Sequence, residues 1–349
     1  MRAQRIHRRR QRRGSRRLWP LLGVAAVGVL AIAVATRWER RERRKLQPGR
    51  RRTHLPEERQ PSPSEPGRGF GGIPEAPEVP GTAESTQVWI AGPAGNLFVR
   101  DGGSVPGAHA GLRPVLFVHG LAGNGGQWAL QLDHLRRRRR ALALDLRGHG
   151  DSDPADDGSY DVPALARDVA AVADHFALRR LFLVGHSLGA SVAIEYAGLH
   201  PERVAGLLLV DPNGDQTRLP RSAVEPFLAA LSADPLHELA SYYRQLLVGG
   251  DRDAAQWVLE DLRLTDEEAI LRAVEASVRY SPLPALARYQ GPRLAVISDL
   301  NDLPYSLHNL LPALPVQLLR GTGHWLMMDR PEPFNHLLEE FLAAAEGAG

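Results

Sequence analysis

LFLVGHSLGASVAIEYAGL, residues 181–199, joins a short apolar run to a helical segment through the pentapeptide Gly-His-Ser-Leu-Gly. The run 181–185 predicts a β-strand covered on both faces, and the segment 188–199 predicts an α-helix. A serine at such a strand-to-helix turn is held in strained backbone geometry with its hydroxyl exposed. The flanking glycines avoid Cβ clashes where the helix packs close to the strand. Ser187 is therefore a candidate nucleophile.

Apolar runs of the same kind recur along the chain. We expect strands at Pro114–His119, Ala141–Asp145, Leu181–Gly185, Val204–Asp211, Leu294–Ser298 and Val316–Leu319. A hairpin signal precedes them, with strands at Thr86–Ala91 and Asn96–Asp101. Between the later strands lie helical stretches, at Val162–Phe176, Leu188–Leu199 and Pro331–Ala345. This alternation predicts an α/β fold, in which helices cover both faces of a mostly parallel, eight-stranded sheet. Active sites in such sheets lie at the carboxyl ends of the strands.

One interval breaks the alternation. From about residue 213 to residue 284 the pattern is helical only, and predicted strands lie on both sides of it. We therefore expect an insertion that folds over one end of the sheet as a helical cap and shapes a pocket. Its aromatic residues Tyr242, Tyr243 and Trp257 fit an apolar pocket and ordinary core packing equally well.

A serine hydroxyl needs a base within reach to act as a nucleophile at neutral pH. The chain has 13 histidines, and His324 is distinguished by its place in a glycine-rich loop after the last predicted strand. It also follows Ser187 in the order expected of a base in this kind of fold. We take His324 as the candidate base.

Acyl-transfer chemistry also needs two N–H groups aimed at the developing oxyanion. The residue after the nucleophile, Leu188, supplies one backbone N–H. We assign the other to Leu121, in the glycine-rich loop His119-Gly120-Leu121-Ala122-Gly123 that follows the strand PVLFV.

Over about residues 86–345 the chain resembles the α/β-hydrolase superfamily in its capped, single-domain form. The motifs that carry the resemblance are FVHGLAG (117–123), LDLRGHGDSD (144–153), VGHSLG (184–189), LVDP (209–212) and GTGHWLMMDRPEPFN (321–335). The resemblance implies a triad in the chain order serine, acid, histidine, with the acid on the loop after the seventh strand.

The acid is where the sequence departs from the family pattern. The family usually ends the seventh strand with Gly-x-x-Asp, whereas this chain has Asn301 at the expected place and Asp302 one residue on. We expect Asp302 to hold the imidazole of His324 after a one-residue adjustment of the loop. Two alternatives stay open: Asp299, and Asp211 at the end of the sixth strand, where some family members place their acid.

The resulting expectation is a serine hydrolase that cleaves a carboxylic ester or a related acyl compound through an acyl-enzyme on Ser187. Amide, C–C bond, perhydrolase and lyase chemistry use the same residues. No metal or organic cofactor is implied. The irregular acid motif motivates a different hypothesis, a non-hydrolytic, membrane-tethered binding or scaffolding member of the same fold.

Charge is divided unevenly along the 349 residues. Residues 1–52 contain 18 basic and two acidic residues, whereas the remaining 297 contain 25 basic and 38 acidic ones. An acidic body gives no support for nucleic-acid binding. The chain has no cysteine, which excludes disulfides, thiolate metal sites and a cysteine nucleophile.

Within the basic arm, residues 18–36 are uncharged and predominantly apolar. As a helix they would span about 28 Å, close to the roughly 30 Å of a bilayer core, so we expect a single-pass anchor. A cleaved export signal is the alternative, because Ala33-Val34-Ala35 is a small-x-small site. Nine arginines before residue 18 are hard to translocate, which favours a body on the extracytoplasmic side. The arginines would also attract anionic lipid headgroups.

The arm and the body are joined by residues 53–84, which are rich in Pro, Glu and Gly. Such a composition buries too little apolar surface to fold, and predicts an extended linker. The predicted organisation is thus a basic arm (1–52), a linker (53–84) and a hydrolase domain (85–349). The sequence leaves the oligomeric state and the acyl substrate open.

Overall fold

The computed structural model describes residues 86–102 and 111–347. The basic arm, the transmembrane helix predicted over residues 18–36 and the linker over residues 53–84 lie outside the described residues. Within the described ranges, no helix combines the length and the apolar character needed to cross a membrane.

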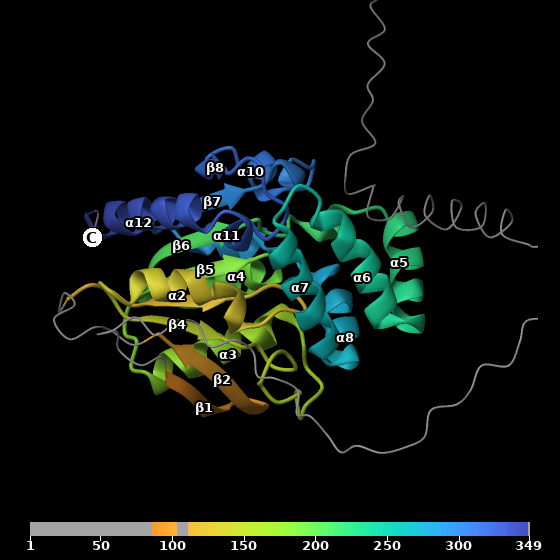
Figure 1. Ribbon diagram of the computed structural model, residues 1–349, viewed down its shortest axis with the longest axis horizontal. Helices are drawn as coiled ribbons and strands as arrows, with labels where there is room; N and C mark the ends of the chain where they lie inside the picture. The colour runs from red at the N-terminus through yellow and green to blue at the C-terminus, as the bar shows by residue number, and fades with distance from the viewer. Residues whose placement is uncertain (1–85, 103–110, 348–349) are drawn as a thin grey trace, which may run out of the picture.

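An eight-stranded sheet forms the centre of the described part of the chain, as predicted (Figure 1). The strands are β1 (Thr86–Gly92), β2 (Gly95–Asp101), β3 (Val115–Val118), β4 (Ala141–Leu144), β5 (Leu181–His186), β6 (Val204–Val210), β7 (Arg293–Ile297) and β8 (Val316–Leu318). They lie in the order β1-β2-β4-β3-β5-β6-β7-β8. Strand β2 runs antiparallel to both of its neighbours, and all other neighbouring strands are parallel.

The order of the strands places Ser187 near the middle of the sheet. Strand β5, which precedes this serine, pairs with β3 on one side and with β6 on the other. All residues of β3, β4, β5 and β6 are buried, because helices cover both faces of these strands. Such continuous apolar strands are typical of a parallel sheet with two covered faces.

Strand β8 differs from its prediction. The apolar run Val316–Leu319 predicts a strand covered on both faces, but all three residues of β8 are exposed. The reason is its position, because β8 is the last strand of the described sheet and pairs only with β7. An edge strand can keep apolar side chains in contact with solvent, as Val316 and Leu318 do here.

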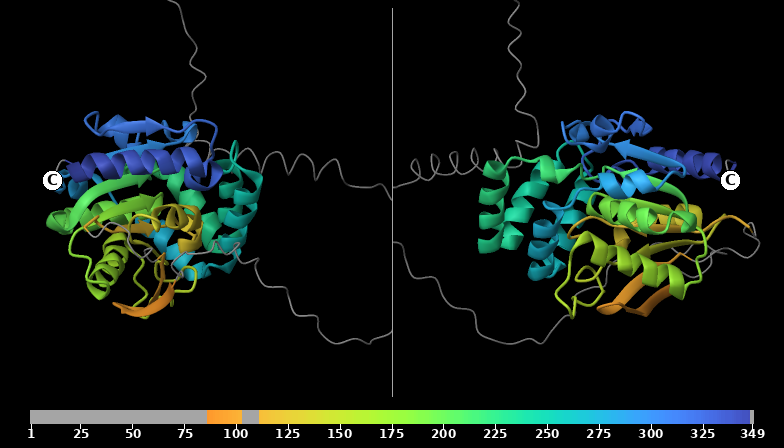
Figure 2. Two further views of the ribbon diagram at one scale, coloured as in Figure 1. Left: turned by 60° about the vertical axis from the view of Figure 1, so that its left-hand side comes forward. Right: turned by 180° about the vertical axis from the view of Figure 1, so that it is seen from behind.

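Two layers of helices pack on the sheet (Figures 1 and 2). One face is covered by α3 (Val162–His175), α4 (Leu188–Leu199) and α9 (Leu283–Arg288). The other face is covered by α2 (Ala129–Leu135) and α12 (Pro331–Gly347), with the short α11 (Leu326–Asp329) before α12. Alternate residues of the central strands serve the two layers, since Leu183 belongs to the first core and Val184 to the second.

Four helices between β6 and β7 stand beyond the end of the sheet and form the cap (Figure 1). They are α5 (Arg221–Ala233), α6 (Pro235–Leu246), α7 (Arg252–Leu264) and α8 (Glu267–Ser277). Each of α6, α7 and α8 begins at an aspartate whose carboxylate accepts hydrogen bonds from the first turn, at Asp234, Asp251 and Asp266. The chain then returns to the sheet through α9, which contacts α4.

Candidate active site

Ser187 lies in the sharp turn between β5 and α4. Its backbone has φ 53° and ψ −115°, a conformation that a residue with a side chain adopts only under strain. The Ser187 N–H donates to the carbonyl of Val210 in the neighbouring strand at 3.0 Å, which ties the turn to the sheet. The strain is therefore held by the surrounding structure, and it presents the serine at the carboxyl end of the central strand.

The two glycines of the pentapeptide are required by close backbone contacts. A Cβ on Gly185 would lie 2.3 Å from the carbonyl oxygen of Gly189. A Cβ on Gly189 would lie 2.3 Å from the carbonyl oxygen of His119, in the loop after β3. Neither backbone oxygen can move away as the end of a flexible side chain could. The glycines thus allow the helix, the strand and this loop to converge at Ser187.

His324 and Asp211 form a close pair in the same region. The Nδ1 atom of His324 lies 2.6 Å from Oδ2 of Asp211, and both residues are buried. A carboxylate only accepts hydrogen bonds, so Nδ1 carries the proton and donates it. In the tautomer that carries its proton on Nδ1, the imidazole has its lone pair at Nε2.

Asp211 is held by several donors besides His324. Its carboxylate accepts from the backbone N–H of Ser298 at 2.8 Å, from the hydroxyl of Ser298 at 2.9 Å and from the side-chain amide of Asn301 at 3.1 Å. Asp211 follows β6 with φ 41°, and its own N–H donates to Val296 in β7. These bonds satisfy a carboxylate that is only 1% exposed, and they fix its orientation toward His324.

The expected contact between Asp302 and His324 is not formed. The Asp302 carboxylate is exposed and accepts from Asn309 at 3.0 Å. Asp299 is also exposed, and it pairs with Arg320. The physical reason lies in the short helical turn Asp299–Asn301, in which only Asn301 is buried. Of the three carboxylates considered from the sequence, the structure brings Asp211 to His324.

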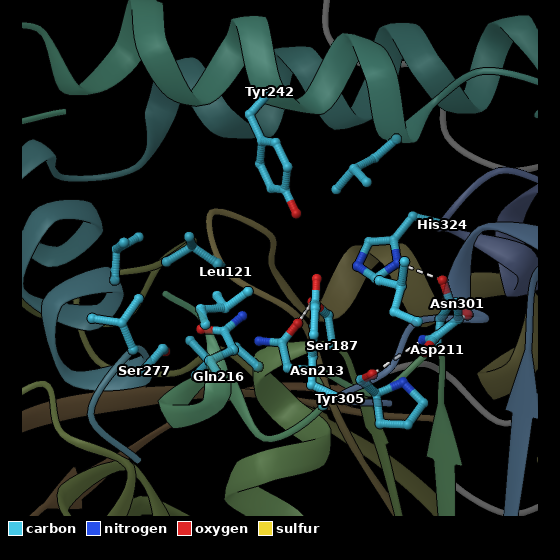
Figure 3. A pocket seen from close by; sticks show the side chains of 18 of the residues that line it. Leu121, Ser187, Asp211, Asn213, Gln216, Tyr242, Ser277, Asn301, Tyr305 and His324 are labelled. Atoms are coloured by element: carbon cyan, nitrogen blue, oxygen red, sulfur yellow. Dashed lines mark hydrogen bonds and ion pairs between the residues drawn. The ribbon is translucent and has the colours of Figure 1, made fainter. Parts of the chain in front are cut away.

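Ser187 and His324 line one pocket beneath the cap, together with Asp211 (Figure 3). The hydroxyl of Ser187 donates to Oδ1 of Asn213 at 3.2 Å and makes no hydrogen bond to His324. Catalytic hydrogen bonds are often long or misaligned in a protein without ligand, and a serine hydroxyl turns about one bond. The residues are thus gathered in one place, with the serine turned toward Asn213.

Sequence reasoning missed His186, the residue between Gly185 and Ser187. Its ring is fully buried and donates from Nε2 to the backbone carbonyl of His324 at 2.9 Å. Burial, and secondarily the neighbouring His324, lower the pKa of His186 well below its ordinary value, so the ring is neutral. His186 therefore ties the loop of His324 to the turn of Ser187, a contact between residues 138 positions apart that no local pattern reveals.

The backbone N–H groups of Leu121 and Leu188 have no hydrogen-bond partner among the described residues, and both residues line the pocket beside Ser187. The loop of Leu121 passes close to the serine, because a Cβ on Gly120 would lie 3.1 Å from Cβ of Ser187. At Ala122 the loop turns with φ 49°, a left-handed conformation. Two unpaired donors at such a position are available to an incoming oxygen.

Apolar side chains dominate the pocket, which contains about 1190 Å³ of space, partly open to solvent. The apolar lining comes mainly from the cap, and Tyr242 points its hydroxyl into the pocket (Figure 3). Burial raises the pKa of Tyr242 to about 12, so this hydroxyl is neutral. Among the described residues that line the pocket, Asp211 has the carboxyl side chain and His324 the imidazole, and no lysine or arginine is present.

Residues 113–239 match the family model described as the alpha/beta hydrolase fold. This match spans the strands β3 to β6, the nucleophile turn and the first part of the cap. The chain has the α/β-hydrolase fold. Solved structures of α/β-hydrolases agree: an esterase from Exiguobacterium antarcticum superposes with a TM-score of 0.64, covering 74% of this chain and 100% of its own. At 19% identity this likeness shows the fold alone.

Sequence relatives of this α/β-hydrolase have different names. The chain is 28% identical over 259 residues to the sn-1-specific diacylglycerol lipase ABHD11 of Mus musculus, covering 67% of this chain and 82% of that protein. It is 29% identical over 241 residues to the dihydrolipoyllysine-residue acetyltransferase component of an acetoin cleaving system from Pseudomonas putida, covering 66% of this chain. The chain spans 63% of the length of that component, less than two thirds.

Proposed function

We propose that this α/β-hydrolase cleaves carboxylic esters through an acyl-enzyme on Ser187. The observation that carries the proposal is the hydrogen bond of 2.6 Å between His324 and Asp211, beside a serine in strained backbone geometry. A serine nucleophile, a histidine base and an orienting carboxylate are the three groups that this chemistry requires. In this proposal the acid is Asp211, and Asp302 has no part in the reaction.

The first half of the reaction begins with rotation of the Ser187 hydroxyl from Asn213 toward Nε2 of His324. The oxygen attacks the ester carbonyl carbon while Nε2 takes the proton. Asp211 stabilises the resulting imidazolium through Nδ1–H without taking its proton. The carbonyl oxygen becomes an oxyanion, which accepts from the N–H groups of Leu121 and Leu188. The C–O bond then breaks, and the leaving alcohol takes the proton from His324.

The second half of the reaction releases the acid. A water molecule gives a proton to Nε2 of His324 and attacks the acyl carbon, again with the oxyanion at Leu121 and Leu188. Collapse of this intermediate breaks the bond to Ser187 Oγ, which recovers the proton from His324. The products are one carboxylic acid and one alcohol, and the enzyme returns to its starting state.

The lining of the pocket supports an uncharged, apolar acyl group. No lysine or arginine among the described lining residues could pair with a carboxylate on the substrate, and Asp211 already has a full set of donors. An unpaired charge in such a pocket would lose its hydration without compensation. The name of one relative, a diacylglycerol lipase, refers to an acyl ester, which is consistent with this class of substrate.

The alternative of a non-hydrolytic binding or scaffolding protein no longer has an observation that favours it. It rested on the missing aspartate at position 301, and Asp211 now contacts His324 in its place. Attachment to a membrane through residues 18–36, with the body on the extracytoplasmic side, remains part of the proposal and rests on the sequence.

A fluorophosphonate probe tests the proposal, because it phosphonylates only an activated serine. We expect the full chain to be labelled at Ser187, and Ser187→Ala to abolish the label. Ser191→Ala, a buried serine one turn along α4, is a matched control that should keep it. Folded protein that stays unlabelled would contradict the proposal.

A further inference from the structure

The cap contacts the catalytic loops through hydrogen bonds as well as through packing. Tyr243 on α6 donates its hydroxyl to the backbone carbonyl of Leu121. Three residues further along the same helix, the carbonyl of Leu246 accepts from the N–H of His324 at 2.8 Å. One helix of the cap therefore contacts both the loop of the candidate base and the loop of the candidate oxyanion donor.

A second cap helix, α7, binds the loop that contains Leu121 at residues that follow Gly123. The carboxylate of Asp261 on α7 accepts from the side-chain amide of Asn124 at 2.8 Å and from that of Gln127 at 2.9 Å. Asn124 in turn accepts from the N–H of Gly126 and begins the short helix η1 (Gly125–Trp128). The segment from Leu121 to Gln127 is thus anchored to two helices that belong to the cap.

This segment needs external support. It contains the left-handed residue Ala122, and its backbone bond from Gly123 N–H to Gly120 is long at 3.3 Å. Tyr243 binds the carbonyl of Leu121, and the N–H of this pocket-lining residue has no partner among the described residues. Fixing the carbonyl limits rotation about the backbone bonds of Leu121. A donor that is held in place before the reaction stabilises an oxyanion better than one that must be ordered during it.

Tyr243 is suited to this task. Its side chain is buried and packs edge to face on Trp325, with 4.9 Å between ring centroids. Burial raises the pKa of the Tyr243 phenol above its ordinary value, so the hydroxyl is protonated at neutral pH and can donate. The ring is fixed by packing, and the hydroxyl adds one directed bond.

We propose that Tyr243 is a positioning residue for the oxyanion hole, holding the backbone of Leu121 from the cap through its carbonyl so that the N–H of the same residue points at the reacting carbonyl. The inference rests on the proposed function, because it assumes acyl transfer at Ser187. It assigns the cap a part in the chemical step in addition to shaping the pocket. A tyrosine that served only to pack the cap would affect stability and substrate binding and leave transition-state stabilisation unchanged.

The substitution Tyr243→Phe separates these roles, because it keeps the ring and removes the hydroxyl. Tyr289→Phe is the matched control: Tyr289 is also buried and donates to a backbone carbonyl, that of Pro292, but it does not line the pocket. For each variant we would measure kcat and KM with a chromogenic ester. We would also measure inhibition by a trifluoromethyl ketone, which adds to the serine and places an oxyanion in the hole.

For Tyr243→Phe we expect kcat to fall about 10-fold with little change in KM, less than the loss of a donor itself would cause. The inhibition constant of the ketone should rise by a similar factor, and Tyr289→Phe should change neither. Unchanged kcat and ketone affinity, or a higher KM with intact kcat, would overturn the inference. If Tyr243→Phe does not fold, Asp261→Asn can be tested instead, because it weakens the hydrogen bonds from α7 to the same loop. It should likewise lower kcat and the affinity for the ketone. Unchanged values in folded Asp261→Asn would overturn the inference.

The fluorophosphonate label distinguishes this inference from the proposed function. Labelling of the wild-type chain with unaltered kinetics in Tyr243→Phe would remove only the role of Tyr243. Absence of labelling in the wild-type chain would overturn both.

Discussion

The side-chain amide of Asn301 donates to Oδ1 of Asp211 across 3.1 Å, joining the loop after β7 to the end of β6. Position 301 is where the family pattern leads one to expect the acid. In this chain an amide there supports a carboxylate that comes from the neighbouring strand. A carboxylate at both positions would place two like charges in contact and raise the pKa of one of them. The end of one strand therefore supplies the carboxylate that contacts His324, and the loop after the other supplies a donor that supports it.

Replacing the carboxylates one at a time tests the assignment of the acid. Asp211→Asn removes the acceptor that selects the productive tautomer of His324, and kcat should fall by about 10⁴-fold. Asp302→Asn and Asp299→Asn alter exposed side chains and should change kcat by no more than about twofold. Steady-state kinetics on folded variants measure this. A large loss in Asp302→Asn with a silent Asp211→Asn would reverse our assignment.

Changes at the glycines of the nucleophile turn test the packing argument. Gly189→Ala places a Cβ 2.3 Å from the His119 carbonyl, and we expect a loss of about 3 kcal/mol in the free energy of unfolding. Gly347→Ala, near the end of α12, meets no atom within 4 Å and should cost nothing. Urea unfolding curves of both variants measure the difference. Equal stability of the two would show that the helix does not approach the loop as closely as described.

The pH dependence of stability should reflect Asp261. Burial is the main cause that raises the pKa of this carboxyl from 3.8 to about 6, and the nearby carboxylate of Asp145 adds to the rise. The hydrogen bonds from Gln127 and Asn124 and the charge of Arg100 act in the opposite direction. A carboxyl with a higher pKa in the folded state binds more protons when folded, between about pH 4 and pH 6. Its ionisation therefore destabilises the fold as the pH rises through this range.

Asp261→Asn does not titrate, and it isolates the effect. The wild type should lose about 1 kcal/mol of unfolding free energy relative to this variant between pH 5 and pH 7.5. Urea unfolding at the two pH values measures the difference. A gap between wild type and variant that stays constant, or that changes in favour of the wild type at higher pH, would contradict an elevated pKa.

The absence of cationic side chains from the described lining of the pocket predicts selectivity against charged acyl groups. The p-nitrophenyl ester of hexanoic acid and the mono-p-nitrophenyl ester of adipic acid have the same chain length and differ by a terminal carboxylate. We expect kcat/KM to be at least about 10-fold higher for the hexanoate, because the pocket cannot compensate the lost hydration of the charge. Equal values for the two esters would require a cation that the described pocket does not have.

The sequence predicts most of the sheet, the turn that contains Ser187 and the loop that contains His324, because these depend on local patterns. Continuous apolar runs mark buried parallel strands, and the pentapeptide around Ser187 marks a tight turn whose glycines have local causes. Strand β8 was predicted at the right place, but its exposure was not, since an apolar run does not reveal whether a strand lies at the edge of a sheet.

The acid could not be chosen from the sequence, because the choice depends on which side of a short turn faces inward. In the turn 299–301 only Asn301 is buried, and the neighbouring carboxylates point to solvent. The contacts of His186 and Tyr243 could not be predicted from the sequence either. Each binds a backbone carbonyl more than 120 positions away, and a backbone acceptor leaves no trace in residue type.

The proposed mechanism requires a covalent bond between Ser187 and the acyl group of the substrate. Rapid quenching of the full chain during turnover of p-nitrophenyl hexanoate, followed by peptide mass spectrometry, measures it directly. We predict a burst of nitrophenol and a mass gain equal to one hexanoyl group on the peptide that contains Ser187, both absent in Ser187→Ala. Turnover by the wild type with this peptide unmodified throughout, or undiminished turnover by Ser187→Ala, would contradict the mechanism.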